Sequence, residues 1–343
     1  MPGVDVRALE AFLAPVVGPV EGLRVSLLSG GRSNLTYELR ADPTHGPAAG
    51  ERRWVLRRPP LGMIPETAHD MAREAAVMAA LAPTPVPVPA VIARCDELGV
   101  LGAPFYVMEK VEGTVFRSDA DLAALTPDAA TSLAHGFVDT MAALHLVDPG
   151  RVGLDGFGRA DGYLARQVRR WGRQLEATCE REIPGFAELA AKLGADIPAQ
   201  PRAAVVHGDY RLDNVIVDPH APHGVRAVLD WEMATLGDPL ADLGLFHLYW
   251  IGWHGIDNPI AGTPGALPGF PAWETLAERY ATRTGLNLER FAWYAAFACF
   301  KLAVICEGIH TRHTRGLTVG DGFASIGDMV PQLVDRGLTT LHA

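Results

Sequence analysis

The sequence is poor in cysteine and has no long hydrophobic run. Its four cysteines, Cys95, Cys179, Cys299 and Cys306, form no C-x-x-C pair, which argues against a structural zinc site and suits a reducing cytoplasm. The most apolar stretch, Phe291–Phe300, is about half the length needed to span a bilayer, so it predicts a buried helix. The chain does not open with a basic stretch and an apolar run, so no secretory signal is expected. We therefore expect a cytoplasmic protein with no membrane partner.

Two familiar motifs are also missing. The sequence has neither a Walker A motif nor a G-x-S-x-G nucleophile elbow, which disfavours a P-loop nucleotidase and a serine hydrolase. Basic residues are outnumbered, because 30 Lys and Arg face 40 Asp and Glu for a net charge of −10. A general nucleic-acid partner is therefore not expected.

What is present is enough apolar material for a large core. The chain has 343 residues and 48% hydrophobic content, which suits one large domain or two lobes. Up to about residue 112 the pattern predicts strands interrupted by one helix, and Glu112-Gly113 is the expected hinge. The strands are predicted at Leu23–Leu28, Leu35–Leu39, Trp54–Arg58, Val91–Cys95 and Phe105–Val111, and the helix at Ala68–Leu81.

The rest of the chain is predicted to be mainly helical. Thr126 caps a helix that begins at Pro127 and runs to about His145. Further helices are expected at Tyr163–Ala177 and near Pro239, Trp273, Leu288 and Phe323, with a strand-rich island at Ala203–Leu229 and a loop at Gly252–Pro271. A small β-rich lobe joined to a larger helical lobe predicts a cleft between them, the usual place for a small-molecule site.

The strand-rich island carries the chemistry. In VVHGDYRLDNVIV, residues 205–217, two apolar runs bracket a polar loop, so Asp209 and Asn214 are predicted to meet at the end of a β-hairpin. A second apolar strand ends in Asp230. Phosphoryl transfer needs this set, because one carboxylate accepts the proton of the attacking hydroxyl while an amide oxygen and another carboxylate hold Mg²⁺. The D-x4-N spacing matches a kinase catalytic loop.

A simpler interpretation exists for each of these residues. Asp and Asn are common in hairpin loops, where they bond to nearby backbone groups, so either residue alone would indicate a turn. The combination with Asp230 favours function. His207 is expected to orient the loop, Gly208 to permit its turn, and Asp213 to be solvated or to cap the loop.

The segment HGDYRLDN followed by LDWEMATLGDPLADLG resembles the aminoglycoside phosphotransferase (choline kinase-like) family. WVLRRPP, AHDMAREAAVMAAL, GAPFYVMEKVEGTVF and GYLARQVRRWGRQ resemble its subgroup of kinase domains associated with acyl-CoA dehydrogenases. The resemblance implies an α+β, bilobal protein-kinase-like fold, with residues 1–112 as the nucleotide-binding lobe and 113–343 as the catalytic and substrate-binding lobe. It implies ATP and Mg²⁺ as cofactors, Asp209 as the catalytic base, and Asn214 and Asp230 as metal ligands. Asp238 and Asp242 are expected to cap a helix and brace the loop.

The nucleotide side departs from the family. Arg57 and Arg58 stand where a strand lysine would meet the phosphates, and strand alternation favours Arg57, with Glu74 as its partner. Without the family context, a solvated strand end and an exposed helix residue would be the simpler interpretations. Ser33 and Asn34, in the Ser29–Asn34 turn, are predicted to cover the phosphates, although this turn has no G-x-G-x-x-G pattern. Glu109 and Val111 are predicted to offer backbone groups to adenine.

The leading hypothesis is therefore phosphorylation of a hydroxyl on a small molecule by ATP. The alternatives are an aminoglycoside or other amino-alcohol kinase and a non-catalytic nucleotide-binding pseudokinase. Basic residues near the expected cleft favour an anionic acceptor such as a hydroxyacyl-CoA, with Arg312 and Arg315 as candidate substrate residues. The other basic positions are Arg166, Arg169, Arg170, Arg173, Lys301, His310 and His313, for which solvated helix faces are the simpler interpretation. A metal site at His310 and His313 is not expected, because neighbouring arginines would repel a cation.

Overall fold

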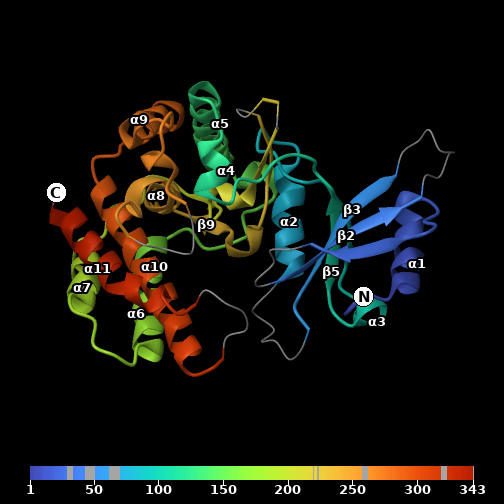
Figure 1. Ribbon diagram of the computed structural model, residues 1–343, viewed down its shortest axis with the longest axis horizontal. Coiled ribbons are helices and arrows are strands. Elements are labelled where there is room, and N and C mark those ends of the chain that lie inside the picture. The colour runs from blue at the N-terminus through green and yellow to red at the C-terminus, as the bar shows by residue number, and fades with distance from the viewer. Residues whose placement is uncertain are drawn as a thin grey trace. The chain divides into compact units, whose positions relative to one another are not determined.

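The computed structural model describes residues 1–28, 34–42, 51–61, 70–218, 220–221, 224–256, 262–317 and 323–342. Two compact units make up the chain (Figure 1). Unit 1 comprises Met1–Gly113 together with Arg226–Ala234, and unit 2 comprises Thr114–Val225 and Thr235–Ala343. Arg226–Ala234 therefore belongs to unit 1, although it lies more than 100 positions after the rest of that unit in the sequence.

Unit 1 is built on a five-stranded antiparallel sheet with the strand order β1-β2-β3-β5-β4. The strands are β1 (Arg24–Leu27), β2 (Leu35–Ala41), β3 (Arg52–Arg58), β4 (Val91–Cys95) and β5 (Phe105–Glu109). All five strands that the sequence predicts are present. Helix α2 (Met71–Leu81) begins at the cap Asp70, whose side chain accepts the amide of Arg73.

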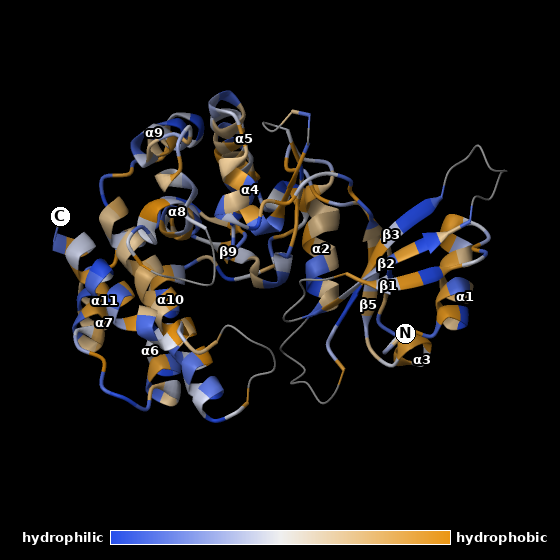
Figure 2. Cartoon of the chain, in the orientation of Figure 1, coloured by the Kyte–Doolittle hydropathy of each residue, from blue (hydrophilic) through white to orange (hydrophobic). Residues whose placement is uncertain are grey.

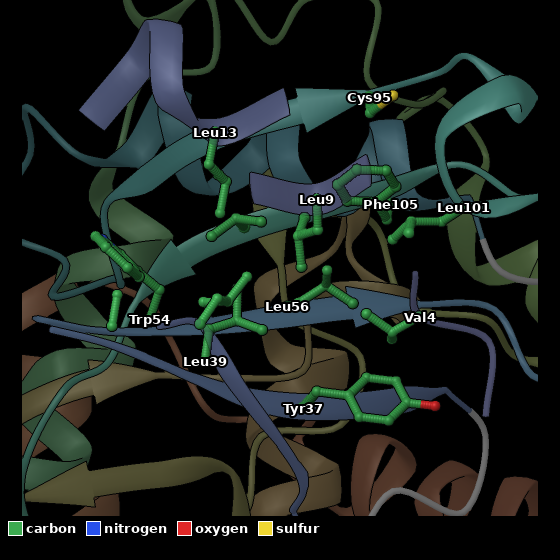
Figure 3. Close-up of a cluster of buried hydrophobic side chains, with 13 residues drawn as sticks. Val4, Leu9, Leu13, Tyr37, Leu39, Trp54, Leu56, Cys95, Leu101 and Phe105 are labelled. Atoms are coloured by element: carbon green, nitrogen blue, oxygen red, sulfur yellow. The ribbon is translucent and has the colours of Figure 1, made fainter. Parts of the chain in front are cut away.

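One correction concerns the N-terminus of unit 1. The sequence predicts a single helix up to about residue 112, yet α1 (Val6–Val17) and the short α3 (Leu98–Leu101) are also present and pack on the sheet. Leu9 and Leu13 of α1 are fully buried and face Leu56 and Phe105 of the sheet (Figure 3). Asp5 caps α1 by accepting two backbone amides, and this cap followed by apolar residues at helical spacing is the overlooked signal.

Unit 2 is mainly helical. Its helices are α4 (Asp119–Ala123), α5 (Pro127–Leu146), α6 (Tyr163–Thr178), α7 (Phe186–Ala195), α8 (Pro239–His247), α9 (Trp273–Thr284), α10 (Phe291–Thr314) and α11 (Ile326–His342). The sequence missed α4 and α7. Helix α10 packs against α6, α8 and α11, while α9 carries many hydrophilic residues (Figure 2). Among the described helices, α10 alone is long and apolar enough to cross a membrane, but 78% of its most apolar window is buried, as in a core helix.

A second correction concerns the predicted hairpin around the catalytic loop. Strand β6 (Ala204–Val206) pairs antiparallel with β9 (Thr235–Gly237), and not with the strand that follows it in sequence. The loop after β6 ends in a 3₁₀ turn at Leu212–Asn214, directly before β7 (Val215–Val217). Asp209 and Asn214 therefore belong to the loop between β6 and β7. The next strand in the sequence is β8 (Val225–Val228).

Candidate functional site

The carboxylate of Asp209 is held from both sides by residues of unit 2. Asn214 Nδ2 donates to Asp209 Oδ2 at 3.2 Å and to the Asp209 backbone carbonyl at 3.0 Å. The Tyr249 hydroxyl donates to Asp209 Oδ1 at 3.3 Å. Each carboxylate oxygen therefore has its own donor, which orients Asp209, and the amide oxygen of Asn214 points away from this contact.

The loop that carries Asp209 is braced by a buried carboxylate. Asp242, in the first turn of α8, accepts the backbone amides of His207 at 2.6 Å and Gly208 at 2.9 Å, and its Oδ2 lies 3.3 Å from His145 Nε2. Burial would raise the pKa of Asp242, but His145, His207 and the Gly208 amide hold it below its ordinary value. An ionised carboxylate thus fixes the start of the loop, as predicted.

Two further contacts complete this brace. Gly208 has φ 83°, a left-handed conformation that glycine adopts without strain, and His207 Nδ1 lies 3.3 Å from the Asp209 amide. Lys301, in the middle of α10, donates from Nζ to the Gly208 carbonyl at 2.8 Å. The sequence grouped Lys301 with the basic residues near the end of this helix, but Lys301 contacts the loop that carries Asp209.

Asp238 has the predicted capping role. Its side chain accepts the Leu240 amide at 2.9 Å at the start of α8 and also accepts the Tyr294 hydroxyl at 2.9 Å. Burial raises the pKa of Asp238 to about 6. This residue connects α8 to α10 within the core of unit 2.

An aromatic cavity adjoins the catalytic loop inside unit 2. It is lined by Phe116, Leu122, Phe137, Arg211, Phe246 and Trp250 among others. Arg211 pairs with Asp213 and lies over the Tyr249 ring, 5.1 Å from its centroid. Asp213 is thus an ion-pair partner of Arg211. Tyr249 lines the cavity and also contacts Asp209, so the cavity opens beside the candidate base.

Unit 1 holds the second group of candidate residues, around Arg57 of β3. Arg57 Nε lies 3.0 Å from Glu74 Oε2 of α2, and Nη2 pairs with Asp230 Oδ1 and lies 3.7 Å from Glu232 Oε2. Burial raises the pKa of Glu74 to about 7, and the positive charge of Arg57 acts against that rise. The ion pair that the sequence predicts between Arg57 and Glu74 is therefore present.

Neighbouring side chains connect the carboxylates of this cluster. Tyr106 of β5 donates from its hydroxyl to Glu74 Oε2 at 2.8 Å. Asn34 Nδ2 donates to Glu74 Oε1 at 3.2 Å and to Glu232 Oε2 at 3.1 Å. Because Asn34 is only 2% exposed, its place is within the cluster, and its contact with a nucleotide stays a prediction.

Asp230 has a constrained backbone. Its φ is 65°, and it is the one non-glycine residue with positive φ in the part of the chain that the structure describes. A side chain in this conformation costs about 1–3 kcal/mol and is most common at functional sites. Trp231 Nε1 donates to the Val228 carbonyl at 2.9 Å, and Arg73 of α2 donates to the Ala234 carbonyl at 3.1 Å, which hold the turn in place.

The cluster offers carboxylate oxygens to a cation, although among the described residues no group of three or more Asp, Glu, His or Cys side chains is placed to hold a metal ion by itself. Three carboxylates, Glu74, Asp230 and Glu232, surround the single guanidinium of Arg57, so the ionised cluster has an excess of two negative charges. Asp230 and Glu232 are partly exposed, with side-chain exposures of 29% and 27%, and can therefore reach a ligand. Carboxylate oxygens with residual negative charge are the donors that Mg²⁺ prefers.

The remaining candidate residues fall in different places. Arg58 points away from Glu74 and donates to the carbonyls of Gly3 and Leu101. The Glu109 amide donates to the Ala90 carbonyl at 2.8 Å, so only other backbone groups of Glu109 and Val111 remain for adenine. Ser33 lies outside the described residues.

The two candidate substrate residues lie at the end of α10. Arg312 is exposed, and Arg315 is paired with Glu180 on the surface of unit 2. Sequence reasoning missed Tyr249, Glu232 and Tyr106, because nothing in their local patterns indicates a partner so distant in sequence. The DWE triplet was the one available signal for Glu232.

The sheet unit with its Arg–Glu pair and the helical unit with its braced Asp-x4-Asn loop define a phosphotransferase with a kinase-like fold. Residues 24–294 match the sequence model of the phosphotransferase enzyme family, APH, and the chain belongs to this family. The family resemblance and the bilobal fold predicted from the sequence are thereby confirmed.

The chain is also similar to the human protein Acyl-CoA dehydrogenase family member 11, with 32% identity over 342 residues. This match covers 97% of the chain but 43% of that relative, so the chain spans less than half of its length. A solved structure from Ralstonia eutropha, described as a candidate aminoglycoside phosphotransferase, has 32% identity and a TM-score of 0.84 over 98% of both chains. The GDP complex of aminoglycoside 2′-phosphotransferase-IIIa has the same fold, with 14% identity and a TM-score of 0.61 over 98% of this chain and 100% of its own.

Proposed function

We propose that the chain uses ATP and Mg²⁺ to phosphorylate a hydroxyl group of a small, anionic acceptor, a hydroxyacyl-CoA being the preferred candidate. The observation that carries the proposal is the orientation of Asp209 by Asn214 and Tyr249 on a loop fixed by Asp242. A turn residue would not need a separate donor on each carboxylate oxygen. A general base does, because its lone pair must face the hydroxyl that it deprotonates.

In the proposed reaction Asp209 accepts the proton of the acceptor hydroxyl while that oxygen bonds to the γ-phosphorus of ATP. The bond between the γ-phosphorus and the β,γ-bridging oxygen breaks, and ADP leaves. Arg57, anchored by Glu74, would bind the phosphates, and Asn214 and Asp230 would hold Mg²⁺, which when bound neutralises phosphate charge. Glu109 and Val111 would offer backbone groups to adenine.

The arrangement of α10 supports an elongated anionic acceptor. Lys301 contacts the catalytic loop, and Arg312 follows eleven residues later on the same helix. At about 1.5 Å and 100° per residue, Arg312 lies roughly 16 Å further along the axis and on nearly the same face. A hydroxyl at Asp209 and phosphate charges near Arg312 and Arg315 would suit an acyl chain joined to a distant phosphorylated group.

The cavity beside Asp209 favours the same class of acceptor. Five of its thirteen lining residues are aromatic, and its charged residues are Arg117, Arg211 and Asp213. A site for a polycationic aminoglycoside would be lined with carboxylates, and these residues instead suit a carbon chain that carries negative charge. The similarity to a dehydrogenase-associated domain supports an acyl-CoA, although the relative's name says nothing of phosphotransfer.

The competing function is a nucleotide-binding pseudokinase, which the absence of the strand lysine motivates. The ion pair between Arg57 and Glu74 supplies the charge that the lysine would carry. An aminoglycoside or other amino-alcohol kinase is the second alternative, which the family membership keeps open.

The test is a panel of hydroxyacyl-CoAs, free hydroxy acids and kanamycin-like amino alcohols, incubated with ATP in the presence and absence of Mg²⁺. Mass spectrometry should find a gain of one phosphoryl group on a hydroxyacyl-CoA, with Mg²⁺ required. Turnover of kanamycin-like polycations with none of hydroxyacyl-CoAs would overturn the acceptor assignment. ATP binding without turnover of any alcohol would support the pseudokinase.

Charge reversal tests the acceptor residues. Arg312→Glu or Arg315→Glu should raise KM for the acyl-CoA about tenfold while changing KM for ATP little. Arg290→Glu is the matched control, because Arg290 is an exposed arginine of unit 2 that pairs with Asp196. Equal effects of all three substitutions would mean that the acceptor senses only the overall charge.

A further inference from the structure

Glu232 is a third carboxylate beside Arg57, two residues after Asp230. Its Oε2 lies 3.7 Å from Arg57 Nη2 and accepts Asn34 Nδ2 at 3.1 Å. Glu74 is almost fully buried, whereas the Glu232 side chain is 27% exposed. Glu232 therefore occupies the part of the cluster that a ligand can approach.

The geometry of the cluster depends on an arginine. A guanidinium presents five N–H groups in a rigid plane, whereas a lysine ammonium is a compact point charge. Arg57 uses Nε toward Glu74 and Nη2 toward Asp230 and Glu232, so one side chain joins α2 to the turn after β8. A lysine at this strand position could not face the carboxylates of both segments with separate groups.

We propose that Glu232 is a positioning residue that, together with Asp230, holds the Arg57 guanidinium where it binds the nucleotide phosphates. Asp230 and Glu232 together hold the Nη2 arm at the turn, and Nη1 is the terminal group that these contacts leave for the phosphates. The inference rests on the nucleotide-binding part of the proposed function and assigns a residue to it. A carboxylate beside phosphates would by itself repel them. Any favourable effect of Glu232 on nucleotide binding must therefore act through a positively charged group.

The effect of a Glu232 substitution, compared between arginine and lysine at position 57, separates the proposed role from a purely structural one. Glu232→Gln removes the charge but keeps an oxygen that can accept Asn34 Nδ2. In the wild-type background this substitution should weaken Mg²⁺–ADP binding about tenfold, measured by calorimetry. In the Arg57→Lys background it should change binding less than about twofold, because the ammonium does not need the second carboxylate.

The control is Glu51→Gln, which removes a surface carboxylate that pairs with Arg24 and Arg40 on the same sheet and should leave ADP binding unchanged. A second readout needs no nucleotide. Thermal unfolding of the wild type, Glu232→Gln, Arg57→Lys and the double variant should show that the two substitutions are not additive.

The outcomes are distinct. Equal losses of affinity in both backgrounds, or tighter binding after Glu232→Gln in both, would overturn the proposal, because Glu232 would then act independently of Arg57. If the wild-type chain binds no Mg²⁺–ADP, the proposed function fails, and the unfolding experiment still decides about Glu232. Additive shifts in that experiment would also overturn the assignment.

Discussion

The hydroxyl of Tyr249 donates a hydrogen bond to Oδ1 of Asp209, the carboxylate proposed as the general base. Tyr249 comes from the segment after α8, forty positions further along the chain. Burial and the negative charge of Asp209 raise the pKa of Tyr249, so the tyrosine remains a neutral donor at physiological pH. This contact gives the base a fixed orientation and leads to the first prediction.

Asp209→Asn should abolish phosphotransfer while nucleotide affinity largely persists, because only the acceptor hydroxyl needs a base. Tyr249→Phe should lower kcat by a smaller factor, about tenfold, since the base remains but is less well oriented. Single-turnover rates and ADP binding would be measured for both variants. Wild-type turnover in Asp209→Asn would remove Asp209 from the mechanism.

Substitutions of Asp230 should separate its chemical role from its backbone strain. Asp230→Ala and Asp230→Gly should both weaken Mg²⁺-dependent nucleotide binding, because each removes the same carboxylate. The glycine variant should be about 1 kcal/mol more stable than the alanine variant, since only glycine adopts φ 65° without strain. Chemical denaturation measures this difference, and equal stabilities would contradict the left-handed backbone.

The two adjacent arginines should behave differently. Arg57→Ala should impair nucleotide binding strongly, Arg57→Lys less so, and Arg58→Ala little, because Arg58 faces the carbonyls of Gly3 and Leu101. Arg58→Ala should instead destabilise unit 1 by about 1–3 kcal/mol, since it leaves buried carbonyls without their donor. Calorimetry with ADP and thermal unfolding test the pair. Equal losses of affinity would mean that the assignment to Arg57 is wrong.

Glu74 should make stability depend on pH. Its folded-state pKa of about 7 lies above the ordinary carboxylate value, so its contribution to stability is fully present below the unfolded-state pKa and is lost as pH rises through 7. Glu74→Gln should therefore gain stability relative to the wild type between pH 5 and 8, by up to about 3 kcal/mol. Its nucleotide binding should weaken, because Arg57 loses its anchor. If the stability difference between Glu74→Gln and the wild type stayed constant across this pH range, Glu74 would not be a buried carboxylate with a raised pKa.

Asp242 should show the opposite pH behaviour. Its pKa is held below the ordinary value, so its contribution is present above the unfolded-state pKa and is lost as pH falls. Asp242→Asn should cost about 2–3 kcal/mol at pH 7, and the difference from the wild type should shrink below about pH 4. Urea unfolding at several pH values measures this. A constant difference would show that the ionised form of Asp242 is not what stabilises the loop.

Local sequence pattern predicted the elements that depend on neighbours in the chain. All five strands of the sheet, α5 with its Thr126 cap, and the Asp238 cap of α8 follow from alternation and capping chemistry. Asp209 and Asn214 are five residues apart, so a single loop is enough to bring them into contact. These features arise from interactions within a few residues, which a sequence displays directly.

Other features were decided by partners distant in sequence. The apolar runs around the catalytic loop suggested a hairpin, but β6 pairs with β9, because strand pairing depends on which faces the whole unit buries. Helix α1 carries its own cap and apolar spacing, and the sheet supplies the surface that buries Leu9 and Leu13.

The charged cluster shows the same limit most clearly. The sequence by itself determined that a carboxylate ends the strand before Trp231 and that an arginine ends β3. Only the tertiary structure decided that Arg57 meets Asp230 and Glu232, residues more than 170 positions away. The reason is that a buried charge is tolerated only where the fold supplies compensating charges, and those come from whichever segments pack there.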